Sequence, residues 1–428
     1  MANGKKQRTG DNTGSQGKLY QKKFSPLKKI IICLTVIAIV IAGVVLVRRI
    51  AGQISGSEGT NSSQQVKRKR QGTNPSSQKT PQITVRKNSI SLFLAGDALL
   101  HSTVYQDAQI GPDRYNFDKQ LSSVTSIARK YDLEYYNQET ILGGSSLGLS
   151  GYPTFNSPQQ FGTYMVSQGF NLVSTANNHA LDRGLKGIQN SRKFWNAQKG
   201  VLAQGTNSSQ AEYDHLATMK VKGISLAFLS YTYGTNGITP QYPWEVNYYP
   251  GHEKEMLAKV AEAKKRVDLV IVAMHWGTEY AHEPNEEQKT LARKLSKAGA
   301  GIIIGNHVHT IQPFQWVGKT PVFYAMGNLI SSQLKTDNLI GMIGSLTITK
   351  TSRISKTGST STVTVSNPTA DLIYTHMVGT YPGKRSRVKV YTFQELNNSL
   401  LKNYSSLYKE YSARVRSMDK RITIGPLT

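Results

Sequence analysis

The sequence predicts an α/β fold from about residue 89 onward, and two patterns support this prediction. Six short runs rich in apolar and β-forming residues recur along the region: SISLFLAG, FNLVSTA, ISLAFLSY, VDLVIVAMHW, AGIIIGN and PVFYAMGN. Helical stretches lie between them, such as the one around Leu291 to Ala298. Strands that alternate with helices are typical of layered α/β proteins.

After residue 344 the pattern changes. The runs SLTITK and STVTVS flank a Ser/Thr-rich loop and predict a β-hairpin. A helix with one apolar face is predicted next, from the spacing of Leu400, Tyr404, Leu407, Tyr411 and Val415. We therefore expect a main domain over residues 89–344 and a C-terminal extension, hairpin plus helix, over residues 345–428.

A membrane anchor is predicted near the N-terminus. Residues 30–47, IIICLTVIAIVIAGVVLV, carry no charge and are just long enough to span a bilayer core. A cleavable signal peptide is the alternative, but no A-x-A-like site precedes the arginines that follow the run. The residues just before the run contain more basic side chains than the residues just after it, which favours a cytoplasmic N-terminus.

This anchor divides the N-terminal region into three segments. Residues 1–29 are expected to be a cytoplasmic basic tail, residues 30–47 a transmembrane signal anchor, and residues 48–88 a flexible basic linker rich in Gly, Ser and Gln. The body of the protein is then expected outside the cell, attached to the membrane by a single pass.

The charge balance predicts an anionic partner. The chain has 52 Lys and Arg against 26 Asp and Glu, a net charge of +26. Phospholipid headgroups and anionic wall polymers fit this charge. Nucleic acid is not expected, because no zinc-finger or RNA-binding signature is present and much of the charge precedes the folded body. Cys33, inside the apolar run, is the only cysteine, so the chain forms no internal disulfide.

Polar clusters stand at the ends of the predicted strands and predict a metal site. The clusters are Gly96-Asp97, Asn137-Gln138-Glu139, Asn177-Asn178-His179, His275 to Glu279, Gly305 to His309, and Gly327-Asn328. The carboxyl ends of strands in an open α/β sheet converge on one crevice. Carboxylate, amide and imidazole donors together suit Mn, Zn or Fe, as one ion or two. The candidate ligands are Asp97, Glu139, Asn178, His275, His307 and His309.

Each cluster also has a structural interpretation. A Gly-Asp pair after a strand is often a turn, and His275 could hydrogen-bond a neighbouring loop. The pair His307 and His309 is the stronger signal, since alternation along an extended backbone would place both imidazoles on one side. The joint occurrence of all six clusters favours a site over six separate coincidences.

Six motifs carry a family resemblance. GDALLH, YYNQET, STANNHALDRG, MHWGTEY, GNHVHTIQP and YAMGNL resemble the motifs of the CapA family, capsule or poly-γ-glutamate synthesis proteins with a calcineurin-like metallophosphatase fold. The resemblance covers about residues 89–344. It implies a metallophosphatase-like layered α/β sandwich as the ectodomain, and it agrees with the Gram-positive members of the family.

The resemblance also implies roles. Asp97 matches a ligand of one metal, Glu139 the bridging carboxylate, and His309 a ligand that returns to the first metal. Asn178 matches the asparagine ligand of the N-H motif, and His179 its catalytic or transition-state-stabilising histidine. His275 and His307 would complete the second metal. Leu99 stands where the usual motif has a ligating histidine, so His101 is expected either to compensate or to contact substrate. With His179, it is the second candidate catalytic residue.

Four further residues match family positions, and we expect them to support the ligands or contact substrate. They are Glu279, Tyr280, Gln312 and Asn328. Loop capping is the alternative for each of them.

Two functions follow from the sequence. The first is a surface enzyme of capsule or poly-γ-glutamate synthesis, a metal-dependent hydrolase or transferase acting on an anionic polymer or a phosphoester precursor; cleavage of the polyglutamate amide needs the same chemistry. The second is a non-catalytic, polymer-binding subunit of a synthesis and export complex. An amide ligase and small membrane subunits are the expected partners in that complex.

Overall fold

The computed structural model describes residues 83–427. Within that range no helix is long and apolar enough to cross a membrane. The predicted tail, residues 1–29, and the predicted span, residues 30–47, lie outside the described residues, as does nearly all of the predicted linker.

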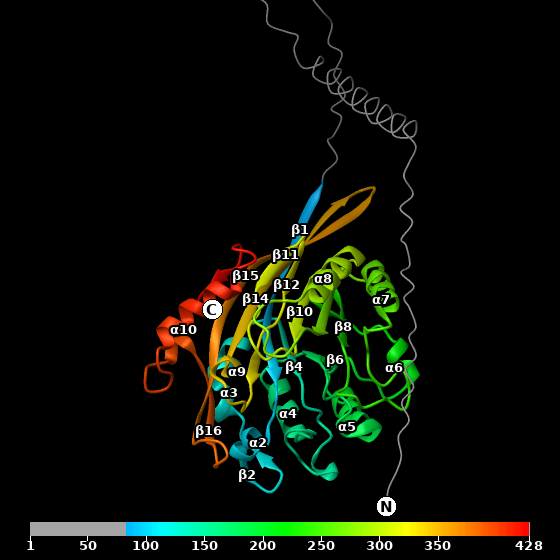
Figure 1. Cartoon of the computed structure of the whole chain (residues 1–428). Helices are drawn as coiled ribbons and strands as arrows, with labels where there is room; N and C mark the ends of the chain where they lie inside the picture. The colour runs from blue at the N-terminus through cyan, green and yellow to red at the C-terminus, as the bar shows by residue number, and fades with distance from the viewer. Residues whose placement is uncertain (1–82, 428) are drawn as a thin grey trace, which may run out of the picture. The chain divides into compact units, whose positions relative to one another are not determined.

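Two β-sheets form the body, with helices on their outer faces (Figure 1). The larger sheet has nine strands in the order β16-β15-β14-β1-β4-β5-β6, with β13 beside β1 and β17 beside β15. Its strands are β1 (Thr84–Ala98), β4 (Leu133–Gln138), β5 (Leu172–Ser174), β6 (Leu202–Gln204), β13 (Asn328–Ile330), β14 (Ile340–Ser355), β15 (Gly358–Val378), β16 (Ser386–Thr392) and β17 (Thr423–Ile424).

The smaller sheet has six strands in the order β11-β12-β10-β9-β8-β7. They are β7 (Thr218–Val221), β8 (Ile224–Thr232), β9 (Leu269–His275), β10 (Ile302–Asn306), β11 (Phe314–Val317) and β12 (Thr320–Phe323). Strands β2 (Gln109–Gly111) and β3 (Arg114–Tyr115) pair separately. All six runs predicted to be strands contain one, which confirms the α/β prediction.

Helices cover the two sheets on opposite sides. On the larger sheet lie α2 (Ser102–Ala108), α3 (Asp118–Ala128), α4 (Gln159–Ser167) and α5 (Gly184–Asn196); on the smaller sheet lie α7 (Glu253–Arg266) and α8 (Glu286–Ala298). Short helices are α6 (Gln210–Asp214), α9 (Thr336–Leu339), η1 (Ser145–Leu147) and η2 (Phe393–Glu395), and α10 (Tyr404–Val415) lies beside β15 (Figure 1).

Alternation along β1 shows how the layers are built. Leu92 and Leu94 point between the sheets, into a core shared with β8, β9 and β10. Phe93 and Ala95 point the other way, into the core under α2 to α5. Since successive side chains of a strand leave on opposite faces, an uninterrupted apolar run is what a strand between two layers requires.

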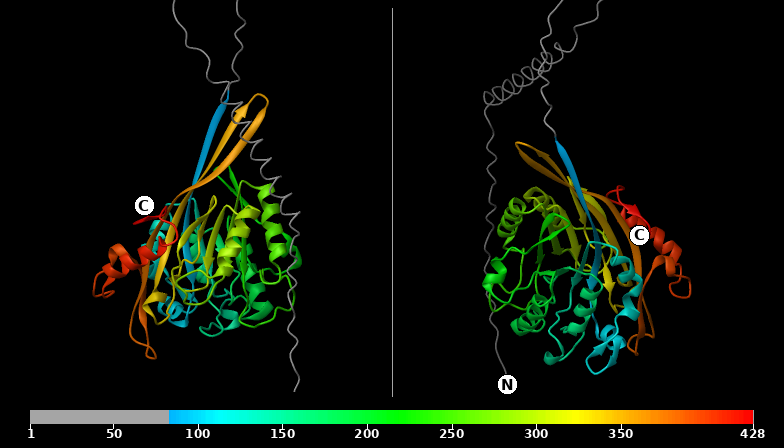
Figure 2. Two further views of the ribbon diagram at one scale, coloured as in Figure 1. Left: turned by 45° about the horizontal axis from the view of Figure 1, so that its top comes forward. Right: turned by 180° about the vertical axis from the view of Figure 1, so that it is seen from behind.

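The segment after residue 344 belongs to the larger sheet. Strand β14 runs through position 344 and pairs antiparallel with β1 from Leu94 back to Thr84. The predicted hairpin is present as β14 and β15, joined around Ser355–Gly358, and its tip projects with the start of β1 beyond the helices (Figure 2). The predicted boundary at residue 344 therefore falls within a strand, and the first described strand begins at Thr84, before Ser89.

Candidate metal centre

The polar clusters meet where strands of both sheets end. Asp97 lies near the end of β1, Glu139 directly follows β4, and Asn178 follows β5 after a short loop. From the smaller sheet, β9 ends at His275 and β10 ends just before His307. Asn328 differs from expectation, because it begins β13 rather than following a strand, and it pairs with Asp97.

Glu139 is the centre of this arrangement. Its side chain is fully buried, and neither carboxylate oxygen has a hydrogen-bond partner. Two triads of candidate ligands share it: Glu139 with His275 and His307, and Glu139 with Asp97 and His309, the ligand atoms of each triad lying within 4.8 Å of one another. The resemblance implied the same division, with Glu139 between two metals.

The spacing of these donors fits ligands of a common ion. Glu139 Oε1 lies 3.7 Å from His275 Nε2 and 3.5 Å from His309 Nε2. These separations are too long for good hydrogen bonds. Two ligands about 2.1 Å from a tetrahedral ion would lie about 3.4 Å apart.

Three buried amides orient the candidate ligands. Asn137 Nδ2 donates to Asp97 Oδ1 at 2.8 Å, Asn178 Oδ1 lies 2.9 Å from His275 Nε2, and His309 Nδ1 lies 3.0 Å from Asn328 Oδ1. The last contact leaves His309 Nε2 facing Glu139. Hydrogen bonds of this kind fix the tautomer and ring direction of a ligating histidine.

The electrostatics favour a bound cation. Burial raises the pKa of Glu139 well above its usual value, although the nearby His309 opposes the shift. Burial, aided by the charges of neighbouring histidines, lowers the pKa of His307 to about 3 and holds that of His275 well below its usual value. Burial alone would lower the pKa of His309, but Glu139 and Asp97 raise it to about 9. The Glu139 carboxylate, which has no hydrogen-bond donor, and the neutral imidazoles of His275 and His307 form a donor set that a divalent ion would satisfy.

The backbone between the two histidines is not extended, so that prediction is wrong. Strand β10 ends at Asn306, and φ is +100° at His307 and +59° at His309. Contacts of the loop hold this conformation: His307 N donates to Asp97 Oδ2, and Asn338 Nδ2 donates to the His309 carbonyl. Strained backbone of this type costs about 1–3 kcal/mol per residue and is concentrated at functional sites.

A cavity of about 420 Å³ opens beside the triads, and both predicted catalytic histidines line it. His179 Nδ1 lies 2.8 Å from Asp182 Oδ2, so an Nδ1–H would donate to the carboxylate and leave Nε2 as the second ring nitrogen. His101 Nδ1 instead accepts from Ser332 N at 3.3 Å, and His101 belongs to neither triad. Leu99 also lines the cavity.

The four supporting candidates lie in different places. Asn328 contacts His309, whereas Glu279 and Tyr280 line the cavity, Tyr280 with 46% of its surface exposed. Gln312 is fully buried outside the cavity lining, and its amide donates to the carbonyls of Ala281 and Glu283. It therefore fixes the loop that follows Tyr280.

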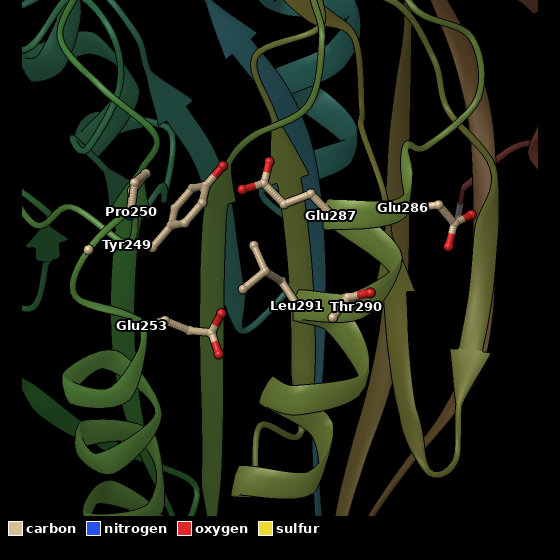
Figure 3. A pocket seen from close by; sticks show the side chains of 8 residues that line it. Tyr249, Pro250, Glu253, Glu286, Glu287, Thr290 and Leu291 are labelled. Carbon is tan, nitrogen blue, oxygen red and sulfur yellow. The ribbon is translucent and has the colours of Figure 1, made fainter. Parts of the chain in front are cut away.

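A second hollow, of about 480 Å³, lies where α7 and α8 begin (Figure 3). It is lined by Tyr249, Pro250, Gly251, Glu253, Glu286, Glu287, Thr290 and Leu291. Although it is slightly larger than the first cavity, two of its carboxylates are already paired, Glu253 with Lys294 and Glu286 with Lys289. None of the predicted site residues lines it.

No role was predicted from the sequence for three residues of the site, although Asn137 belongs to one of the predicted polar clusters. Asn137 donates to Asp97, and Asp182 accepts from His179. The Tyr233 ring lies 4.5 Å from that of His307, measured between centroids. Asp182 has a detectable signal, because it follows His179 by three residues on the same turn. Tyr233 has none, since only the fold brings the end of β8 beside the loop after β10.

Comparison with known proteins identifies the family. The family model described as "Bacterial capsule synthesis protein PGA_cap" matches residues 91–333. Two curated relatives match a shorter stretch: the PGA biosynthesis protein CapA of Bacillus subtilis (strain 168), 33% identical over 176 residues, and the capsule biosynthesis protein CapA of Bacillus anthracis, 32% identical over 170 residues. The matches cover 40% and 39% of this chain and 44% and 41% of the relatives, so the chain spans less than half the length of either.

Among solved structures, the 5'-nucleotidase from Candida albicans SC5314 matches with a TM-score of 0.35 and 14% identity, over 60% of this chain and 48% of that chain. A match at this level bears on neither mechanism nor substrate. The family model alone spans more than half of the chain and includes every triad residue. This chain belongs to the bacterial capsule synthesis protein family PGA_cap.

Proposed function

We propose that this protein is a cell-surface, metal-dependent hydrolase or transferase of capsule or poly-γ-glutamate synthesis, acting on an anionic polymer or a phosphoester precursor. One observation carries the proposal: Glu139 is buried at the junction of two triads with both oxygens unpartnered. A buried carboxylate without a hydrogen bond is costly in a folded protein. Two cations shared by one carboxylate would offset that cost.

The residues fit one or two divalent ions. Asp97, Glu139 and His309 would hold one, and Glu139, His275 and His307 the other, with Asn178 Oδ1 beside His275 as an additional oxygen donor. The mixture of oxygen and nitrogen donors suits Mn, Zn or Fe. When bound, such ions supply Lewis-acid activation of water and of an ester oxygen.

His179, positioned by Asp182, would act as the general acid. Asp182 accepts from His179 Nδ1 and also from Phe155 N at 2.6 Å, so its carboxylate is fixed in place. The Phe155 ring meets the imidazole edge-on with a centroid separation of 4.6 Å. Held from two sides, the imidazole would present Nε2 to substrate in the cavity and donate a proton to the leaving oxygen or nitrogen.

The setting at the membrane is part of the proposal. The apolar run at residues 30–47 would anchor the chain with its N-terminus in the cytoplasm and the described body outside the cell. An amide ligase and small membrane subunits would be its partners in polymer synthesis. The printed names of the Bacillus relatives support only the capsule or PGA biosynthesis part of the proposal.

Hydrolysis of a generic phosphodiester tests the function. The purified full chain, supplied with Mn²⁺, is expected to hydrolyse bis-p-nitrophenyl phosphate, and His307→Ala is expected to reduce the rate at least 100-fold. Glu134→Gln, a change to a buried glutamate at the opposite end of β4, should keep the wild-type rate. Equal rates for wild type and His307→Ala would overturn the proposal. In that case polymer binding without catalysis would be the better account.

A further inference from the structure

Arg385 is a half-buried arginine that has no acidic partner. It precedes β16 in the loop after β15. Its guanidinium donates to neutral groups, the Gln333 carbonyl and Ser332 Oγ, each at 3.3 Å, and it lies 3.2 Å from Met377 Sδ. Within residues 83–427 no carboxylate lies within ion-pair distance of it. Burial accordingly lowers the pKa of Arg385, with only Tyr381 acting in the opposite direction.

The contacts of Arg385 place it behind the wall of the cavity. Gln333 lines the cavity, and Ser332 N donates to His101, which lines it too. The positive charge of Arg385 also acts on His101: it is among the causes that lower the His101 pKa, after burial. The guanidinium is therefore one residue layer away from the space beside the triads.

This position matters because none of the described residues that line the cavity is Lys or Arg, while Asp182 and Glu279 are acidic. Lys335 stands at the rim, with Nζ 5.7 Å from the centre of the Tyr280 ring. Away from the triads, an anionic chain that entered this cavity would meet the positive charges of Lys335 and Arg385.

We propose that Arg385 forms a recognition site for an anionic group of the substrate, one that is separate from the bond being cleaved. The ligand class is a linear polyanion whose carboxylate or phosphate groups recur along the chain. One such group would bind the solvent-accessible part of Arg385, outside the cavity and next to the Ser332–Gln333 segment, while the scissile bond lies at the triads. The inference rests on the proposed function for the position of that bond, but anion binding at Arg385 does not require catalysis.

A planar guanidinium suits this role. Arginine binds carboxylate and phosphate with two parallel hydrogen bonds, and desolvation strengthens each of them. The neutral contacts to Ser332 and Gln333 fix the side chain without neutralising it. An arginine with a purely structural role could equally well form an ion pair with a carboxylate. Among the described residues Arg385 has no such partner, so its charge remains available to a ligand.

Equilibrium binding of defined probes tests the proposal. Fluorescent hexa-γ-glutamate and hexaphosphate would be titrated into the full chain, wild type and Arg385→Gln, with hexa-γ-glutamine as the neutral probe. We expect Arg385→Gln to weaken binding of an anionic probe about tenfold or more. The neutral probe should bind both proteins equally. A larger loss of affinity for hexa-γ-glutamate would indicate a carboxylate ligand, and a larger loss for hexaphosphate would indicate a phosphate ligand.

Two further variants separate recognition from structure and from net charge. Arg353→Gln removes the same charge from the exposed hairpin, near its tip, and should leave binding of every probe unchanged. Arg385→Lys keeps the charge but loses the paired geometry, so it should recover part of the affinity. A uniform loss with all three probes would show that Arg385 only supports the loop and would overturn the proposal.

The outcome is independent of catalysis. If Arg385→Gln binds the anionic probes as tightly as wild type does, the recognition site is refuted even when bis-p-nitrophenyl phosphate is hydrolysed. If the anionic probes depend on Arg385 but no hydrolysis occurs, the recognition site stands and the enzymatic function fails.

Discussion

Replacing Glu139 by glutamine should abolish the stabilisation of this protein by metal. Glu139 is the only residue shared by the two triads, and both its oxygens lack hydrogen-bond donors. An amide keeps the size of the side chain but loses the charge, and its NH₂ group cannot bind a cation. Metal affinity is therefore expected to fall at least 100-fold, beyond the 10–100-fold typical of residues that only support a ligand.

The expected size of the effect follows from linkage. At a free Mn²⁺ concentration about 100 times Kd, binding to the folded state stabilises it by about 2.7 kcal/mol. An unfolding entropy of about 2.1 cal/mol/K per residue, taken over residues 83–427, is about 0.7 kcal/mol/K. Wild type should therefore gain about 4 °C in Tm, whereas a 100-fold weaker site gains about 0.4 kcal/mol, less than about 1 °C.

Calorimetry with and without Mn²⁺ measures both values. Glu134→Gln is the matched control, because Glu134 is also a buried glutamate of the same strand region but lies at the far end of β4. It should keep the full metal-dependent rise in Tm. If Glu139→Gln gains as much from Mn²⁺ as wild type does, Glu139 is not a ligand and the arrangement of the two triads as a metal centre is wrong.

Three further predictions test other parts of the account. Burial raises the pKa of Glu134 to about 8, so the folded state holds this proton more tightly than the unfolded chain, and stability is lost as pH rises from about 4.5 through 8. In urea unfolding, the free energy of unfolding of Glu134→Gln should therefore rise relative to that of wild type between pH 5 and pH 8. A difference between the two free energies that stays constant with pH would contradict this. Asp182→Asn should lower kcat for bis-p-nitrophenyl phosphate about 10²-fold and keep the metal content, with His179→Ala at least as impaired; unchanged kcat in both would exclude the dyad. Gly96→Ala should cost about 1–3 kcal/mol of unfolding free energy, because a Cβ at Gly96 would lie 1.9 Å from the Gly327 carbonyl oxygen; wild-type stability in urea would refute that close approach.

Much of the centre could be predicted because the ligands are tied to strand ends. Asp97 and His275 each lie at the end of an apolar run that is visible in the sequence, and parallel strands bring such ends together. The family resemblance is likewise confirmed, since it rests on those same motifs.

Other features could not be predicted, because they depend on tertiary contacts. The left-handed backbone at His307 and His309 depends on a hydrogen bond that His307 N donates to Asp97 and on one that Asn338 donates to the His309 carbonyl, and both partners are distant in the sequence. Arg385 reaches the cavity wall only because β15 and β16 form a hairpin beside segment 332–333.

The C-terminal strands show the same limit at the level of the fold. The hairpin was predicted correctly from its local pattern, but local pattern does not reveal its partner. Pairing of β14 with β1 joins residues about 260 apart in the sequence, as in the Ser89–Thr349 contact, and makes the last segment part of the main sheet.

The metal content of the purified full chain decides whether the two triads form a metal centre. After reconstitution with Mn²⁺, Zn²⁺ or Fe²⁺ and removal of free ions, elemental analysis should find one or two equivalents of metal in wild type and Glu134→Gln. Glu139→Gln and His307→Ala should retain clearly less. A folded wild-type protein that binds none of the three ions stoichiometrically would contradict the account.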